Sequence, residues 1–312
     1  MTTLLVLDSD APAYVAELRE RKLADLVIHS ATDANSADPF IEEADIILGQ
    51  PASTAPLLDK AKKLRWLQST FAGIEPLCSQ AVRKDYILTG VKDVFGPLMS
   101  EYVFAYILAR ERSLFATREN QKNRVWAPIA YQGLKHRAIG IVGIGSIGRR
   151  IAATAHHFGM QVFGMKRTRE DVEYLTRLFL PSEKAAFLPL VDYLVVTLPA
   201  TARTSQFLGL ADLKLMKPTS IVMSVGRGDN IDQDGLITAL QKRYIEGAVL
   251  DVFEQEPLPR TSPLWDMDNV FITPHNSAFS FPAQITSLFC DNYARFVAGR
   301  PLKYVVDFAN GY

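Results

Sequence analysis

Two series of short apolar runs, separated by segments of helix length, most constrain what this chain can fold into. The first series comprises residues 4–7, 26–29, 45–48, 64–68 and 86–89, and the second comprises 138–142, 161–165, 193–197, 220–225, 248–252 and 270–273. Strands that alternate with helices form βαβ units, whose strands are parallel and whose helices cover the sheet. The sequence therefore predicts an α/β fold with two doubly wound parallel sheets.

The two series are separated at Val94-Phe95-Gly96-Pro97, where a Gly-Pro pair interrupts the pattern. An amphipathic stretch from about Leu98 to Arg118 follows, and we expect one unbroken helix there. The last helical stretch, about 283–298, has no strand of its own to cover in the second series, so it could return to pack on the first domain. We expect a discontinuous outer domain, residues 1–97 and 283–312, around an inserted domain of residues 98–282.

Composition favours a small-molecule partner. Lys+Arg and Asp+Glu balance at 34 each, so no positive field attracts nucleic acid or a membrane surface. Cys78 and Cys290 lack the spacing of a metal site or disulfide framework, so we expect free thiols and no bound metal. The first residues form a strand pattern rather than a signal peptide, and no apolar run approaches the roughly 18–20 residues of a membrane span. We expect a cytoplasmic protein.

A glycine-rich loop opens the second series. Gly143, Gly145 and Gly148 fit G-x-G-x-x-G directly after an apolar strand, and Ile147, Ile151, Ala155 and Phe158 then recur at helical spacing. Glycines allow a tight turn and a close backbone approach, while the N–H groups and dipole of the following helix receive a pyrophosphate. An ordinary strand-to-helix turn is the alternative. The context favours a Rossmann-type dinucleotide site.

The next strand ends in a basic turn, Lys166-Arg167-Thr168, where a ribose-binding acid is expected about 20 residues after the loop. This turn has no acid to accept the ribose hydroxyls, and two cations with a hydroxyl suit a 2′-phosphate. The sequence therefore predicts NADP(H) as the preferred cofactor, with NAD(H) possible. A solvated basic loop is the alternative.

Three chemically active residues follow strands of the second series: Arg227, Glu256 and His275. In open α/β sheets the carboxyl ends of strands form the ligand site. His275 alone among the five histidines follows such a strand, and imidazole titrates near neutral pH, as a general acid must. Glu256 would fix its tautomer, and Arg227, between Gly226 and Gly228 so that nothing crowds its approach, would hold a carboxylate. Each residue alone could instead be a solvated loop or turn residue.

Several motifs together resemble the D-isomer-specific 2-hydroxyacid dehydrogenase family: Val225–Gly228, Leu250–Pro259, Ser262–Trp265 and Thr273–His275. With the glycine loop, the resemblance covers about residues 97–282. The Lys166–Thr168 turn, the Trp126–Pro128 segment and the Gly311-Tyr312 end look closest to NADPH-dependent glyoxylate/hydroxypyruvate reductases. The resemblance implies a Rossmann-type nucleotide domain inserted in a flavodoxin-like substrate domain.

The resemblance also implies roles for individual residues. Arg227 is the substrate clamp, His275 the acid/base and Glu256 its partner, while Asp251 lies near the nicotinamide. The substrate contacts it implies are Phe71, Ala72, Gly73, Arg227 and His275. The cofactor contacts are Gly143, Gly145, Ser146, Ile147, Gly148, Lys166, Arg167, Thr168, Leu198, Pro199, Val225, Gly226, Asp251 and Ser277.

The sequence thus predicts an enzyme that reduces small 2-oxo acids such as glyoxylate or hydroxypyruvate to 2-hydroxy acids with NADPH. A dinucleotide-sensing binding or regulatory protein on the same scaffold is the alternative. A homodimer is expected, with the long helix after Pro97 at its interface, and Trp126 could contact either the partner subunit or the substrate. Asn276, Ser277 and Phe279 replace the small apolar residues that many family members carry after the histidine.

Overall fold

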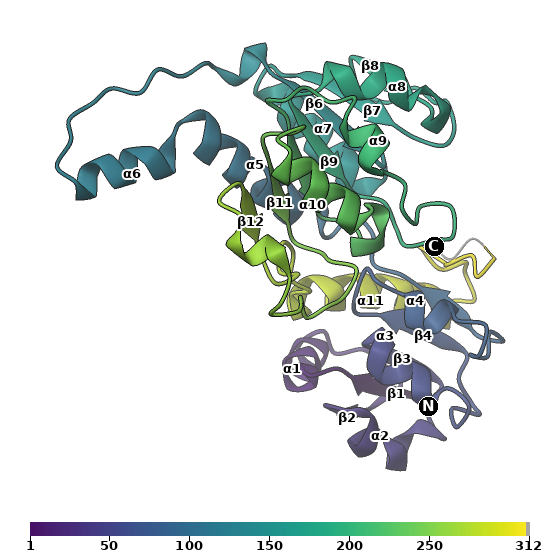
Figure 1. The fold of residues 1–312 in the computed structure, drawn as a ribbon. Coiled ribbons are helices and arrows are strands. Elements are labelled where there is room, and N and C mark those ends of the chain that lie inside the picture. Colours follow the sequence, from purple (N-terminus) through teal and green to yellow (C-terminus); the bar gives the residue numbers. More distant parts are fainter. Residues whose placement is uncertain (310–312) are drawn as a thin grey trace. The chain divides into compact units, whose positions relative to one another are not determined.

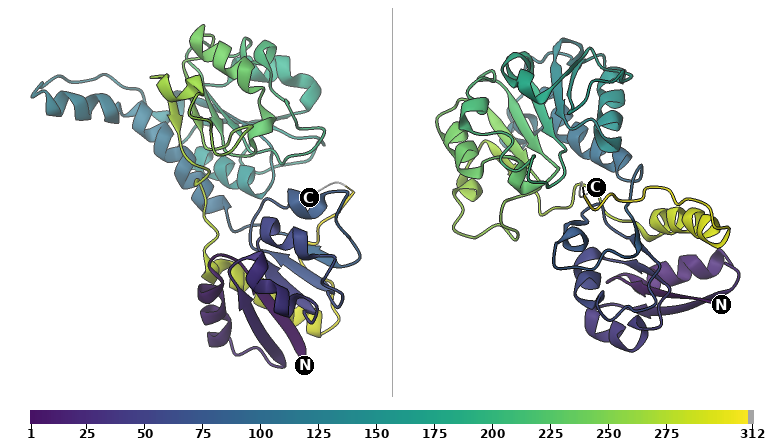
Figure 2. Two further views of the ribbon diagram at one scale, coloured as in Figure 1. Left: turned by 60° about the horizontal axis from the view of Figure 1, so that its bottom comes forward. Right: turned by 90° about the vertical axis from the view of Figure 1, so that its right-hand side faces the viewer.

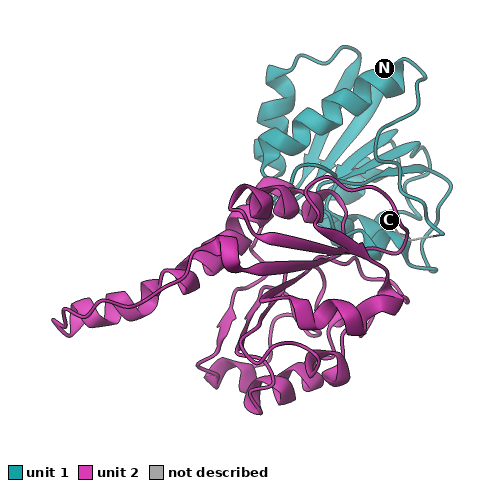
Figure 3. Ribbon diagram, turned by 90° about the horizontal axis from the view of Figure 1, so that it is seen from above, with its two compact units in different colours: residues 1–94, 280–312 teal, residues 95–279 magenta. Residues whose placement is uncertain are grey.

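The computed structural model describes residues 1–309, which divide into two compact units: residues 1–94 with 280–309, and residues 95–279 (Figure 3). The Gly311-Tyr312 end, used above for the resemblance, lies outside the described residues. Each unit contains one parallel sheet with helices packed on it, so the predicted α/β class is confirmed. Cys78 and Cys290 are both free thiols, as expected. No helix within residues 1–309 combines the length and apolarity that crossing a bilayer requires.

The first unit carries a five-stranded sheet in the order β2-β1-β3-β4-β5, the order of flavodoxin-like folds (Figure 1). Its elements are β1 (Thr2–Leu7), α1 (Ala11–Glu20), β2 (Leu26–Ala31), α2 (Ala34–Ile41), β3 (Ile46–Gly49), α3 (Pro51–Thr54), η1 (Ala55–Leu57), β4 (Trp66–Ser69), α4 (Glu75–Cys78), β5 (Ile87–Thr89) and α11 (Pro282–Val297).

The C-terminal helix α11 belongs to this first unit because its aromatic face covers the first sheet. Phe289 stacks on Trp66 of β4 with ring centroids 4.9 Å apart, and both side chains are fully buried. The Asn292 amide donates to Gln68 Oε1 at 3.3 Å, which gives the helix a polar anchor in the same core. Burial of this face is what brings the end of the chain back to its beginning.

The second unit carries a seven-stranded sheet in the order β12-β11-β10-β9-β6-β7-β8, which is the Rossmann order with one added strand. Its elements are α5 (Gly96–Glu111), α6 (Leu114–Lys122), η2 (Leu134–His136), β6 (Ala138–Val142), α7 (Ser146–His157), β7 (Gln161–Met165), β8 (Arg177–Phe179), η3 (Pro181–Glu183), α8 (Lys184–Phe187), η4 (Leu188–Leu190), β9 (Tyr193–Val196), α9 (Leu210–Leu213), β10 (Ile221–Ser224), η5 (Gly228–Asn230), α10 (Gln233–Gln241), β11 (Gly247–Leu250), η6 (Pro263–Asp266) and β12 (Val270–Ile272).

Strand β9 shows why this sheet needs helices on both faces. Tyr193 and Val195 pack with residues of α5 and α7, whereas Leu194 and Val196 pack with residues of α8, α9 and α10. Successive side chains of a strand point to opposite faces, so a continuous apolar run is buried only if both faces are covered. All four strand residues are buried.

The helix expected from Leu98 to Arg118 is broken, which corrects the sequence interpretation. Helix α5 ends at Glu111, Ser113 takes a left-handed conformation with φ 50°, and α6 begins at Leu114. The break lies at the edge of the sheet, where Phe115 in the first turn of α6 stacks on Phe271 of the edge strand β12. Helix α6 buries none of its residues and extends away from its own sheet (Figures 1 and 2). A second difference is β8, a three-residue edge strand with only Phe179 buried, which is too short to give a sequence pattern.

Candidate active site

The three glycines of the loop between β6 and α7 do three different things. Gly143 adopts φ 105°, which favours glycine, and makes the tight turn out of β6. A Cβ on Gly148 would lie 2.1 Å from the Gly143 carbonyl oxygen, so this glycine lets the helix approach the strand. A Cβ on Gly145 would meet no atom within 4 Å, so the protein itself does not require glycine there. An open cradle beside the N-terminus of a twelve-residue helix, with Ser146 and Ile147 in its first turn, fits a dinucleotide pyrophosphate.

The loops after β6, β9 and β10 are tied together beside the point where strand order reverses. The Thr197 hydroxyl donates to the Gly143 carbonyl at 2.7 Å. A Cβ on Gly226 would lie 2.6 Å from the Leu198 carbonyl oxygen, so these two backbones are in close contact. Leu198, Pro199, Val225 and Gly226 therefore lie together at the carboxyl ends of β9 and β10, the end of the sheet at which open α/β sheets bind their ligands.

The basic turn after β7 contains an ion pair that the sequence reasoning missed. Lys166 Nζ lies 2.6 Å from Glu170 Oε1, and Arg149 of α7 contacts the same oxygen. The hydrogen bond from Lys166 lowers the pKa of Glu170 below its ordinary value. Arg167 is exposed and makes no ion pair or hydrogen bond with the described part of the chain, residues 1–309. The Lys166–Thr168 turn thus presents one open cation, Arg167, and one cation, Lys166, that the Glu170 carboxylate holds.

His275 and Glu256 meet at the carboxyl ends of β12 and β11. His275 Nδ1 lies 2.7 Å from Glu256 Oε2, and the other carboxylate oxygen of Glu256 accepts from the Phe253 N–H at 2.9 Å. A carboxylate at Nδ1 holds the proton on that nitrogen in the neutral ring, so Nε2 is the atom that can give and take a proton. The imidazole is half exposed, which leaves Nε2 open to a ligand.

Asp251 anchors the turn that carries His275. Its carboxylate is fully buried and accepts from the Asn276 N–H at 2.9 Å, the Ser277 N–H at 3.1 Å and the Thr273 hydroxyl at 2.6 Å. The Asp251 carbonyl accepts from the His275 N–H at 2.9 Å. The Ser277 hydroxyl is buried without a hydrogen-bond partner among residues 1–309. The resemblance implies that Asp251 lies near the cofactor. Its contacts in the structure are with the turn around His275, which it holds in place.

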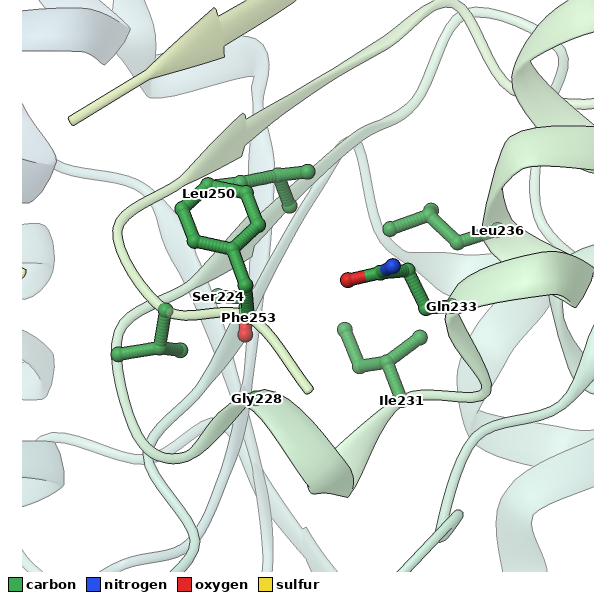
Figure 4. A pocket seen from close by; sticks show the side chains of 8 residues that line it. Ser224, Gly228, Ile231, Gln233, Leu236, Leu250 and Phe253 are labelled. Carbon is green, nitrogen blue, oxygen red and sulfur yellow. The ribbon is translucent and has the colours of Figure 1, made fainter. Parts of the chain in front are cut away.

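Arg227 follows the adjacent strand β10, and the reason for its two glycine neighbours differs from the one expected. A Cβ on Gly228 would lie 1.9 Å from the carbonyl carbon of Phe253, and Gly226 is closed in by Leu198. Both glycines therefore allow backbones to pack, rather than keeping the approach to Arg227 open. Figure 4 shows Gly228 and Phe253 beside a cavity of about 10 Å³, which is room for one water and too small for a substrate.

The predicted substrate loop, Phe71-Ala72-Gly73, lies in the first unit after β4. The Thr70 hydroxyl donates to the buried Asp8 carboxylate at 2.7 Å, and the Phe71 N–H donates to the Ser69 hydroxyl at 3.1 Å. The N–H groups of Ala72 and Gly73 make no hydrogen bond with residues 1–309. Two neighbouring unsatisfied N–H groups at a strand end can bind an anion.

Trp126 lies beyond α6, in a segment that runs back toward β6, and its side chain is 98% exposed.

The sequence did not indicate that Tyr102 and Thr273 take part in the site. Their hydroxyl oxygens lie 2.6 Å apart although the residues are 171 positions apart. Thr273 could have been suspected from its place before Pro274 and His275. No local signal marks Tyr102.

A Rossmann-ordered sheet with an open glycine cradle at its switch point, and a carboxylate-paired histidine at neighbouring strand ends, defines a dinucleotide-dependent oxidoreductase. Comparison with known proteins agrees. Residues 104–277 match the sequence model described as D-isomer specific 2-hydroxyacid dehydrogenase, NAD binding domain. The chain belongs to this family of NAD(P)-dependent oxidoreductases, which act on small 2-hydroxy and 2-oxo acids.

Three similar proteins illustrate the relationship. Glyoxylate reductase of Thermococcus gammatolerans is 33% identical over 240 residues, which are 73% of this chain and 71% of that protein. A crystal structure of a D-isomer specific 2-hydroxyacid dehydrogenase family protein from Aeromonas salmonicida has a TM-score of 0.93 at 45% identity and covers 98% of this chain and 99% of its own. The NADPH-dependent glyoxylate/hydroxypyruvate reductase of Sinorhizobium meliloti, solved with NADP and sulfate, has a TM-score of 0.90 at 26% identity and covers 100% of both chains.

Proposed function

We propose that this enzyme reduces a small 2-oxo acid, such as glyoxylate or hydroxypyruvate, to the 2-hydroxy acid with NADPH. The observation that carries the proposal is the pair formed by His275 Nδ1 and Glu256 Oε2 at 2.7 Å, one strand away from Arg227. Reduction of a carbonyl leaves negative charge on its oxygen, so a proton donor and a nearby cation are the groups that the reaction needs. Relatives named glyoxylate reductase and glyoxylate/hydroxypyruvate reductase support the substrate class.

Each residue has a defined task in this mechanism. Bound NADPH supplies the hydride that the carbonyl carbon accepts. Arg227 holds the substrate carboxylate through its guanidinium group. The substrate contact that the sequence predicts for the Phe71–Gly73 loop of the first unit stays a prediction. His275 gives its Nε2 proton to the carbonyl oxygen, while Glu256 holds the Nδ1 side of the ring. Solvent then returns a proton to Nε2.

His275→Ala tests the catalytic role. General acid catalysis contributes about 10²–10⁴-fold, so kcat should fall by that factor while the Kd for NADPH, measured by fluorescence titration, stays unchanged. His157→Ala is the matched control, because His157 is exposed at the end of α7 and should leave turnover intact. A His275→Ala enzyme that keeps most of its rate would contradict the assignment.

The assay should compare glyoxylate, hydroxypyruvate and phenylpyruvate with the wild-type protein. Turnover of either of the two small acids supports the proposed substrate class, and preference for phenylpyruvate would contradict it. NADPH binding without turnover of any 2-oxo acid would favour the dinucleotide-sensing alternative.

NADPH is the preferred cofactor in this proposal, with NADH possible. The support comes from the basic turn, where Arg167 is open and Lys166 is adjacent, and from the NADP bound to the Sinorhizobium meliloti relative. Replacing Lys166 by Asp and Arg167 by Ala should move the ratio of kcat/KM values toward NADH. Lys62→Ala, an exposed cation of the first unit, is the control. An unchanged ratio would argue against a 2′-phosphate site here.

A homodimer is the proposed assembly, and its proposed contact is the arm, residues 114–133. The arm extends from the second unit (Figures 1 and 2). It exposes several large apolar side chains. Exposed apolar clusters of this kind mark protein–protein contacts in soluble proteins. The exposed residues are Leu114, Phe115, Val125, Trp126, Ile129 and Tyr131.

Sedimentation at micromolar concentration tests the dimer. Trp126→Asp should give a monomer, and Val297→Asp, an exposed apolar position of the first unit, should not. A wild-type monomer would contradict the proposal. If the Trp126→Ala enzyme stays a dimer but has a lower kcat/KM, Trp126 contacts the substrate instead of the partner subunit.

A further inference from the structure

The Thr273 hydroxyl is bonded on both sides. It lies 2.6 Å from the Tyr102 hydroxyl of α5 and 2.6 Å from Asp251 Oδ1, at the end of β11. Tyr102 is partly buried, and burial raises the pKa of its phenol, so the phenol keeps its proton at every ordinary pH. These contacts form a short chain of three side chains that ends on the Asp251 carboxylate.

The direction of the hydrogen bonds between Tyr102, Thr273 and Asp251 follows from counting protons. The Asp251 carboxylate already accepts from the N–H groups of Asn276 and Ser277, which can only donate, and it accepts from Thr273 as well. A hydroxyl has one proton, so Thr273 donates that proton to Asp251 and must accept from Tyr102. Tyr102 is therefore the donor, and its bond polarises and strengthens the bond from Thr273 to Asp251.

The turn that Asp251 anchors is strained. His275 has φ 50°, a left-handed conformation that a non-glycine residue adopts at a cost, and such a conformation persists only where surrounding contacts impose it. The carbonyl of Asp251 holds the His275 N–H, and its carboxylate holds the next two N–H groups. A looser Asp251 would let this turn relax and move the imidazole away from Glu256.

We propose that Tyr102 is a positioning residue, which acts through Thr273 and Asp251 to keep the His275 imidazole against Glu256. The catalytic consequence rests on the proposed function, whereas the effect on the imidazole does not. Tyr102 also joins the site to the cofactor-side helix, because its helix α5 is bonded to α7 through Ser100 and Thr154 at 2.7 Å.

A double-mutant cycle tests whether Tyr102 acts through Thr273. Tyr102→Phe removes one hydrogen bond and should lower kcat about twofold to tenfold, with the Kd for NADPH unchanged. Thr273→Val removes the bond to a carboxylate and should lower kcat about tenfold or more. In the Thr273→Val background, Tyr102→Phe should have no further effect. The same loss from Tyr102→Phe in both backgrounds, or no loss in either, would overturn the proposal.

Two further variants separate positioning from general destabilisation. Thr273→Ser keeps the hydroxyl and should stay within about twofold of wild-type kcat. Tyr14→Phe removes another buried phenol hydroxyl, from helix α1 of the first unit, and should leave kcat unchanged. A Thr273→Ser enzyme as slow as Thr273→Val would show that the hydroxyl is not what matters.

The imidazole itself supplies a readout that needs neither cofactor nor turnover. In the cofactor-free protein at alkaline pH, ¹⁵N spectra should show His275 protonated at Nδ1 and bare at Nε2, and Tyr102→Phe should mix the two tautomers. If the wild type reduces no 2-oxo acid, the proposed function fails, and the tautomer comparison still decides the positioning. Identical tautomer populations in wild type and Tyr102→Phe would overturn the positioning alone.

Discussion

Alanine substitutions at Gly145 and Gly148 separate the two tasks of the glycine loop, folding and cofactor binding. At Gly145 the backbone has φ −91° and ψ −160°, which alanine can adopt, and the added methyl would meet no protein atom within 4 Å. The change in free energy of unfolding should stay within about 1 kcal/mol, because a less favourable N-cap is offset by a stiffer unfolded chain.

The same methyl should impair dinucleotide binding. It would stand in the open cradle, where the pyrophosphate must approach the backbone N–H groups. Loss of one hydrogen bond to a charged group costs about 1.5–3 kcal/mol, so the Kd for NADPH should rise about tenfold to 150-fold.

Gly148→Ala should act on the fold first. Its methyl would lie 2.1 Å from the Gly143 carbonyl oxygen, whereas real Cβ contacts stay above 3.0 Å, so α7 must move by about an ångström. Overpacking of this kind costs about 1–3 kcal/mol, and each kcal/mol lowers Tm by about 2–4 °C in a domain of this size.

The wild type and the two variants are compared by thermal melts without cofactor and by fluorescence titration with NADPH. We expect Gly145→Ala to melt like the wild type and bind weakly, and Gly148→Ala to melt early. The assignment of the open cradle to the pyrophosphate would be refuted if Gly145→Ala bound NADPH as tightly as the wild type. It would also be refuted if Gly145→Ala melted at a temperature as low as that of Gly148→Ala.

Three further substitutions test neighbouring parts of the structure. Glu256→Gln should lower kcat about 10²–10⁴-fold without changing the Kd for NADPH, because the Phe253 N–H keeps the amide oxygen and the amide NH₂ group then faces His275 Nδ1, which favours the wrong tautomer; a loss below tenfold would contradict this. Glu170→Gln releases Lys166 from a competing carboxylate and should tighten NADPH binding about twofold to fivefold in low salt, with NADH binding as the internal control. Glu111→Ala removes a buried carboxylate that accepts from Arg110, Arg137 and Tyr193 and should destabilise the protein by about 2–3 kcal/mol in denaturant melts, whereas Glu119→Ala on exposed α6 should change it little.

The fold class was predictable because it depends on patterns that recur locally. Short apolar runs between helix-length segments predict parallel strands, and the observed strands coincide with those runs to within a few residues, apart from β8. The loop from Gly143 to Gly148 was readable for the same reason, since its strand, turn and helix are neighbours in the chain. The free thiol state of Cys78 and Cys290 was predictable from their number and their spacing in the sequence.

The break after α5 was not predictable from periodicity. The apolar pattern continues through Leu114 and Phe115, but both side chains are more than half exposed, because only the edge strand β12 remains to be covered and Phe115 alone stacks on its Phe271. A helical pattern reports which residues could be buried, whereas the presence of a surface to bury them is a tertiary fact.

The sequence by itself determined which chemistry is present and at which strand ends it stands: Arg227, Glu256 and His275 each follow an apolar run of the parallel sheet. Only the tertiary structure decided how these groups are held. The glycines beside Arg227 serve close backbone packing, and Tyr102 reaches the Thr273 hydroxyl across 171 positions. The physical reason is that strand periodicity is a local property, while a buried hydrogen-bond chain depends on which distant segments the core brings within 3 Å.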